Sequence, residues 1–192
     1  MRRAWLAGVF AAFPSCVAVA FPPTALQDPA QVYLLHQGAH TGVILPAEQD
    51  GEGAWVEYAF GNWEWYGEQR GGTVDALYAL AVPSEAALGR RYSDALPTED
   101  ALLVARGATV QGFQAERVRV RSLRRALDEE FEASPVPPRL LERNGLWIAK
   151  ARRGYSMDSN CSDATLDWMC ALGCEVIAPG ITRSIELRGP RE

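Results

Sequence analysis

The pattern of apolar and polar residues in the first third of the chain predicts three consecutive strands. Across residues 31–36, Val32 and Leu34 fall on one face and Tyr33 and Leu35 on the other, which is the two-residue period of a strand. Gly38 marks a turn, and residues 43–45 form a second strand that Pro46 ends. After a polar, glycine-containing loop, residues 55–60 predict a third strand that pairs with the second as a hairpin.

The middle of the chain alternates between helix-like and strand-like segments. The expected elements are a helix or buried segment at 73–82, a short helix at 84–91, and strands at 101–105 and 116–121. A helix at 123–133 has apolar residues along one face, Ser122 as its N-cap, and prolines after its end.

The last third predicts an irregular approach at 154–160, then a helix at 164–172 that Gly173 ends, then a strand at 174–178. Strands come first and helices are interleaved among them. This order predicts an α+β fold with a mainly antiparallel sheet.

Composition limits the chain to one globular unit. It has 192 residues, of which 48% are hydrophobic and 22% are charged, enough for one core but too few for two domains. The net charge of -5 argues against a nucleic-acid partner, because phosphate binding depends on Lys and Arg. Arg117, Arg119 and Arg121 alternate on a predicted strand, which we interpret as a solvated face.

The N-terminus has the features of a secretory signal. Arg2 and Arg3 precede an apolar stretch at 4–13, and Ala18-Val19-Ala20 fits the rule for cleavage sites. We therefore expect a signal peptide at 1–20, cleavage after Ala20, and an exported domain at 21–192 in the periplasm or cell envelope. Lipidation at Cys16 and an uncleaved anchor are the alternatives. Loss of the two arginines leaves 17 basic and 24 acidic residues, a net charge of -7.

The cysteine count follows from export. Without Cys16, three cysteines remain, at 161, 170 and 174. An odd number in an oxidising compartment suggests one disulfide and one free thiol. Cys170 and Cys174 are the pair that could form the bridge, which leaves Cys161 free.

Cys161 and His40 are the candidate reactive groups. Cys161 lies at the start of the predicted helix, where free N–H groups and the helix dipole favour a thiolate. Ser162 or Asp163 can cap that helix. His40 follows the Gly38 turn, where an imidazole can act as a base, and His36 is its competitor. The alternative for Cys161 is an inert buried cysteine.

A third group is expected to orient the imidazole. Glu57 is our first choice, because it is a carboxylate in an otherwise apolar strand next to the histidine strand. Tyr58 takes the position if the hairpin register is the other way, and Asn62 is a looser candidate. The alternative is that Glu57 simply points to solvent.

Several aromatic and polar residues are expected to contact substrate. Trp63, Trp65 and Tyr66 follow the third strand and could wall a groove, although core packing or a membrane-facing lip would explain them equally well. The full set of expected substrate-binding residues is Trp63, Trp65, Tyr58, Asn160 and Tyr155. We expect no metal site and no cofactor, because the sequence lacks ligand spacing and a phosphate loop.

Two blocks of the chain resemble an uncharacterised bacterial envelope family, domain-of-unknown-function family 2459. The first block comprises residues 32–35, the His40-Thr41-Gly42 triplet and residues 55–62; the second comprises Tyr155-Ser156 and Asn160-Cys161-Ser162. The order of His before Cys is also similar to circularly permuted papain-like, NlpC-type enzymes. Ala39, where that family commonly has an aromatic residue, and Ser162, where it favours Asn, depart from the family pattern.

The resemblance implies a permuted papain-like fold with His40 as base and Cys161 as nucleophile. It implies a cysteine hydrolase or acyltransferase that acts on peptidoglycan peptides or on lipid or lipoprotein acyl groups. The alternative is a non-catalytic module that binds a glycan or lipid on the same scaffold. We expect a monomer, with peripheral membrane association as an option.

Overall fold

The computed structural model of the chain describes residues 17–47, 54–64, 83–178, 180, 182 and 184–189. Cys16, Trp65, Tyr66 and the predicted helix or buried segment at 73–82 lie outside these residues.

The larger sheet has seven strands within the described residues, and every neighbouring pair is antiparallel. Their order is β6-β2-β3-β4-β5-β8-β7. The strands are β2 (Pro29–Gln37), β3 (His40–Pro46), β4 (Trp55–Asn62), β5 (Ser84–Ser93), β6 (Thr109–Glu116), β7 (Arg139–Leu141) and β8 (Leu146–Tyr155). The first three strands predicted from the sequence are therefore confirmed. Gly38 forms the turn between β2 and β3 with a φ of 60°, a conformation that favours glycine.

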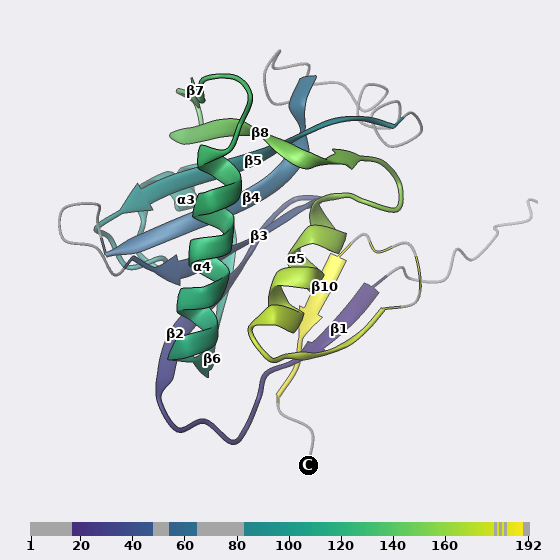
Figure 1. The fold of residues 1–192 in the computed structure, drawn as a ribbon. Coiled ribbons are helices and arrows are strands. Elements are labelled where there is room, and N and C mark those ends of the chain that lie inside the picture. The colour runs from purple at the N-terminus through teal and green to yellow at the C-terminus, as the bar shows by residue number, and fades with distance from the viewer. Residues whose placement is uncertain are drawn as a thin grey trace, which may run out of the picture.

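A smaller, three-stranded sheet joins the two ends of the described chain. Its strands are β1 (Val17–Phe21), β9 (Glu175–Ile177) and β10 (Ser184–Leu187). β1 is the central strand, parallel to β10 and antiparallel to β9. In Figure 1 the purple β1 and the yellow β10 lie side by side next to α5. The cleavage point expected after Ala20 falls inside β1.

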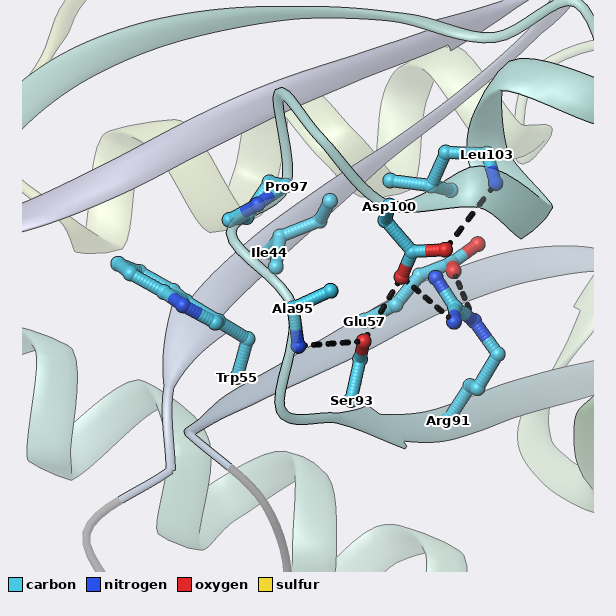
Figure 2. A pocket seen from close by; sticks show the side chains of 9 residues that line it. All are labelled: Ile44, Trp55, Glu57, Arg91, Ser93, Ala95, Pro97, Asp100 and Leu103. Atoms are coloured by element: carbon cyan, nitrogen blue, oxygen red, sulfur yellow. Dashed lines mark hydrogen bonds and ion pairs between the residues drawn. The ribbon is translucent and has the colours of Figure 1, made fainter.

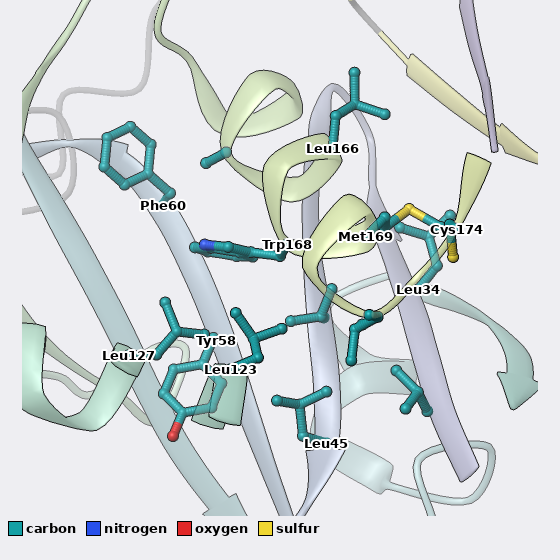
Figure 3. Packing of buried hydrophobic residues seen from close by; sticks show 14 of the residues in the cluster. Leu34, Leu45, Tyr58, Phe60, Leu123, Leu127, Leu166, Trp168, Met169 and Cys174 are labelled. Atoms are coloured by element: carbon teal, nitrogen blue, oxygen red, sulfur yellow. The ribbon is translucent and has the colours of Figure 1, made fainter. Parts of the chain in front are cut away.

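Three helices are described: α3 (Ala101–Ala105), α4 (Arg117–Glu132) and α5 (Cys161–Ala171). The helices α4 and α5 cover one face of the larger sheet (Figure 1). The main hydrophobic core lies between them and the sheet, with Leu45 and Tyr58 from the strands, Leu127 from α4 and Met169 from α5 (Figure 3). The helix α3 packs on the opposite face, where Leu103 meets Leu35 and Ile44. The α+β class with mainly antiparallel sheets is thus confirmed.

The predicted short helix at 84–91 is wrong, because this segment is strand β5. Its residues favour a helix by composition, but β5 lies between β4 and β8 and pairs with both. Leu88 packs into the main core, whereas Ala87 packs on the opposite face with Ile148. Burial on both faces therefore overrides the local preference.

The predicted strand at 101–105 is also wrong, because these residues form α3. Asp100 is the N-cap, and its side chain accepts hydrogen bonds from the N–H groups of Leu102 and Leu103. An aspartate directly before an apolar run is a helix-start signal. The sequence therefore contains a helix-start signal at Asp100, although the apolar run at 101–105 also fits a strand.

The predicted strand at 116–121 is wrong beyond Glu116, which ends β6: residues 117–121 form the first turns of α4, which begins at Arg117 and not after Ser122. The buried residues of α4 are Val120, Leu123, Leu127 and Phe131, which is the spacing of a helix. The alternating arginines therefore do not share a strand face. Arg117 pairs with Asp28, and Arg119 donates a hydrogen bond to the carbonyl oxygen of Ala171.

The C-terminal predictions are confirmed in outline. The predicted helix at 164–172 is α5, which starts three residues earlier at Cys161, and the predicted strand at 174–178 is β9. Gly173 follows α5 with a φ of 95°. Within the described part of the chain, no helix is long and apolar enough to cross a membrane.

Candidate functional site

The site is built on the first turn of α5. Asn160 is the N-cap, where Ser162 or Asp163 had been expected. The Asn160 side-chain oxygen accepts hydrogen bonds from the N–H groups of Ser162 (2.8 Å) and Asp163 (3.3 Å), and the Asp163 carboxylate accepts one from the Asn160 N–H (3.1 Å). Because its amide group also donates to the Met157 carbonyl (3.0 Å), Asn160 orders the chain around Cys161 and does not face outward as a substrate ligand.

Cys161 is the first residue of α5, and it meets the start of β3. The His40 imidazole is close enough to the Cys161 thiol to lower its pKa through hydrogen bonding and charge. The Cys161 sulfur lies 3.6 Å from the carbonyl oxygen of Ala39, the residue directly before His40. The structure therefore brings together the two residues that the sequence analysis selected, although most of the chain separates them.

His36 is the competitor that the structure sets aside. It lies opposite Thr41 in the β2–β3 pair, and burial lowers the pKa of its imidazole. The partners of the Cys161 side chain include His40 and not His36.

The surroundings of Cys161 favour its thiolate. Burial alone raises the pKa of the Cys161 thiol, since the residue is only 8% exposed. The hydrogen bond and charge of His40 act the other way, as do the Thr41 backbone N–H and the Ser162 hydroxyl, and the pKa is lowered overall. The Ser162 hydroxyl is a partner that the sequence analysis missed.

Tyr155 ends β8 beside the same sulfur. Cys161 is close enough to the Tyr155 hydroxyl to shift the pKa of that group, and the Tyr155 ring stacks on Phe60 at 6.0 Å between centroids. Burial first, and then the neighbouring Cys161 thiolate, raise the pKa of Tyr155. The phenol therefore stays protonated at neutral pH and can act as a hydrogen-bond donor.

Two buried threonines join α5 to β3 directly behind the thiol. The Thr165 hydroxyl donates to the Cys161 carbonyl at 2.8 Å. The Thr41 hydroxyl lies 3.1 Å from the Thr165 hydroxyl and 3.3 Å from the same carbonyl. Because Thr41 follows His40 and Thr165 lies one turn after Cys161, this contact fixes the position of the thiol relative to the imidazole.

Glu57 is not the group that orients His40, and this prediction is wrong. Its carboxylate lies on the α3 side of the larger sheet, where it pairs with Arg91 (2.8 Å) and Arg106 (2.9 Å). Arg91 also pairs with Asp100 (2.9 Å). Figure 2 shows Glu57, Arg91 and Asp100 converging under a recess that Trp55 and other residues line. Glu57 is 2% exposed, so it does not point to solvent either.

The alternative third group, Tyr58, is also occupied elsewhere. It lies in the main core, and its hydroxyl donates to Asp128 of α4 at 2.7 Å. It is therefore placed neither to orient His40 nor to bind substrate beside Cys161.

Asn62 is the better placed of the three candidates. Gly42 of β3 pairs with Ala59 of β4. Because the strands are antiparallel, the same register puts His40 level with Gly61, which is next to Asn62 and four residues beyond Glu57. Asn62 is buried, and its side-chain amide donates to the Ser84 hydroxyl at 2.5 Å. The Ser84 hydroxyl lies 3.5 Å from the Tyr155 carbonyl, so Asn62 belongs to the same end of the sheet as Tyr155.

Trp63 does not wall a groove at the thiol. It packs with Ala87, Leu141 and Ile148 on the sheet face opposite the main core. The Lys150 ammonium lies 5.6 Å from the centre of its ring. Trp65 lies outside the described residues, so this part of the aromatic prediction stays a prediction.

The other two cysteines contrast with Cys161. Cys170 is exposed, Cys174 is buried, and both are free thiols in this structure. Burial raises the pKa of Cys170, and it raises that of Cys174 to about 12. Among the described residues, no cluster of three or more His, Cys, Asp or Glu side chains could hold a metal ion.

Comparisons with known proteins add no further identification. No family model, curated protein or solved structure matches this chain.

Proposed function

We propose that this protein is a thiol-dependent acyl-transfer enzyme, with Cys161 as nucleophile and His40 as base. The observation that carries the proposal is the meeting of the first residue of α5 with the start of β3: the Cys161 sulfur lies 3.6 Å from the Ala39 carbonyl oxygen, and the adjacent His40 lowers the pKa of the thiol. A lowered thiol pKa next to an imidazole is the arrangement that activates cysteine nucleophiles.

The proposed reaction starts with transfer of the Cys161 proton to His40. The thiolate attacks the carbonyl carbon of an amide or ester, and a C–S bond forms while the carbonyl π electrons move onto oxygen. When the tetrahedral intermediate collapses, the C–N or C–O bond breaks and His40 gives its proton to the leaving group. Water or an amine then attacks the thioester, with His40 as base, and the free thiol returns.

The groups available for the oxyanion lie at the same helix start. Asn160 uses the N–H groups of Ser162 and Asp163 for capping. The cap does not use the Cys161 N–H, and the Tyr155 hydroxyl is close enough for Cys161 to shift its pKa; in the proposed reaction both groups donate to the carbonyl oxygen of the bound substrate. Two such donors stabilise the charge that develops in the transition state, and one is typically worth about 10²–10³-fold in rate.

The finer fold assignment and the biological setting belong to the same proposal. A histidine on an early strand followed by a cysteine that opens a late helix is the chain order of permuted papain-like enzymes, and the resemblance to family 2459 favours this architecture. We propose an exported envelope enzyme that acts on peptidoglycan peptides or on lipid or lipoprotein acyl groups. We propose that it works as a monomer, with peripheral membrane association as an option.

An acyl-enzyme experiment tests the proposal. The protein is mixed with an excess of p-nitrophenyl acetate, quenched in acid, and analysed by intact mass and peptide mapping. We expect one acetyl group on Cys161, no labelling in Cys161→Ala, and a strongly slowed reaction in His40→Ala. Cys170→Ala is the control that keeps the label. Acetylation at Cys170, or acetylation of Cys161 that does not depend on His40, would contradict the proposal.

A further inference from the structure

The strand β1 overlaps the segment that looks like the end of a signal peptide. Four of its five residues, Val17 to Ala20, precede the cleavage point expected after Ala20. Ala18 and Ala20, the two small residues of the cleavage motif, are both 0% exposed. They belong to the main hydrophobic core and not to a detached leader.

Cleavage after Ala20 would remove the middle of the smaller sheet. Every β10 residue pairs with a residue of this segment, from Val17 opposite Ser184 to Ala20 opposite Leu187. On the other side, two of the three β9 pairs would also be lost. Because β9 and β10 are not neighbours, their backbone groups would lose their partners on that edge.

The smaller sheet also supports the helix that carries Cys161. Ala18 and Ala20 share the main core with Leu166 and Met169 of α5, and with Ile185 of β10. The backbone N–H of Arg188 bonds to the Ala20 carbonyl at 3.0 Å, which continues this pairing beyond β10. Loss of β1 would therefore expose apolar surface on the side of α5 that faces the smaller sheet.

We infer that Val17–Phe21 is a structural strand of the working protein, and that any proteolytic processing of the leader takes place before Val17. The small, apolar residues that resemble a cleavage motif are small because they are packed inside the sheet under α5. The targeting signal and the folded domain meet at β1, and cleavage after Ala20 would leave a domain without its central strand.

The direct test is the mass of the protein made from the full chain. The chain with a C-terminal tag is expressed in a Gram-negative host, and the folded product is purified from the envelope and the soluble fractions. We expect an N-terminus at or before Val17, with or without an added lipid. A folded product that begins mainly at Phe21 would overturn the inference.

Two truncated chains give a second, independent readout. Both are made without export; one keeps residues 17–192 and the other keeps residues 21–192. We expect the longer chain to unfold near the temperature of the full chain, and the shorter one to lose its cooperative transition or to unfold at least about 10 °C lower. Equal unfolding temperatures for the two would overturn the inference. Neither result depends on catalysis, so the inference stands or falls apart from the proposed function.

Discussion

The two faces of the larger sheet hold buried polar groups in very different states. On the α3 face, Glu57, Arg91, Arg106 and Asp100 neutralise each other through pairs of 2.8–2.9 Å. On the α5 face, the Cys161 side chain is next to His40, and its pKa is lowered, which favours the thiolate. The charges of the first arrangement are paired within the cluster and suit a structural role, whereas the second arrangement is the one on which the proposed acyl transfer depends.

The contrast also explains why Glu57 looked functional in the sequence. A carboxylate in an apolar strand is unusual, and a catalytic role or a buried ion pair can account for it equally well. Its partners come from β5 and from the residue that follows α3, both distant in the sequence. Only the three-dimensional register decides between the two roles.

The largest expected effect is on the α5 face. Replacement of His40 by Ala removes the base and should slow acyl transfer by about 10²–10⁴-fold. The matched control is His36→Ala, which removes the other histidine and should retain most of the activity. The rate of acetylation of Cys161 measures both. Equal losses in the two variants would remove the distinction between the histidines.

The next largest effect is on the stability of the α3 face. Glu57→Leu leaves Arg106 without its carboxylate partner while Arg91 keeps Asp100, so one buried charge is uncompensated and the free energy of unfolding should fall by about 3–5 kcal/mol. Glu85→Gln, at an exposed pair with Lys150, is the control and should cost less than about 1 kcal/mol. Urea denaturation measures both. If the folded Glu57→Leu protein also lost its thiol reactivity, the two faces would not be independent.

Tyr155→Phe tests the proposed donor beside the thiol. We expect acyl transfer to slow by about 10–100-fold, with little loss of stability, because the ring and its stacking on Phe60 remain. Tyr58→Phe is the control on a hydroxyl that bonds Asp128. It should lower the free energy of unfolding by about 1 kcal/mol and leave the rate unchanged. A normal rate in Tyr155→Phe would assign Tyr155 to packing alone.

The smallest expected effect is at the threonine contact behind Cys161. Thr165→Val keeps the shape but removes the hydroxyl that bonds the Cys161 carbonyl, so it should cost about 1–2 kcal/mol in stability. If the contact positions the thiol, the pH profile of Cys161 alkylation should also move upward. Thr165→Ser should restore both properties. A stability loss with an unchanged pH profile would make the contact purely structural.

The sequence predicted the elements and residues whose signals are local. Cys161 at a helix start and His40 beside a glycine turn each depend on a few neighbouring residues, and both lie where expected. The first three strands were found for the same reason. Their alternation is regular, and short turns or loops separate them.

The parts that failed depend on distant contacts or on patterns with two meanings. Arg117, Arg119 and Arg121 alternate like a strand, but the helix period of Val120, Leu123 and Leu127 decides the structure. The β5 segment is helix-like in composition, and its two neighbouring strands make it a strand. A small, apolar stretch such as 17–20 fits a signal cleavage site and a buried strand equally well, and only its pairing with β10 separates them.

The most direct test of the account is the pH dependence of alkylation at each cysteine of the native protein. Iodoacetamide reacts with thiolates, and peptide mass analysis resolves the rate at Cys161 from that at Cys170. Because its pKa is lowered, Cys161 should stay reactive as the pH falls below the ordinary thiol range of about 8.5, and should lose reactivity only at lower pH. Cys170, whose pKa is raised, should need a higher pH. We predict that His40→Ala moves the Cys161 profile upward toward that of Cys170. A Cys161 profile at or above that of Cys170, unchanged by His40→Ala, would contradict the account.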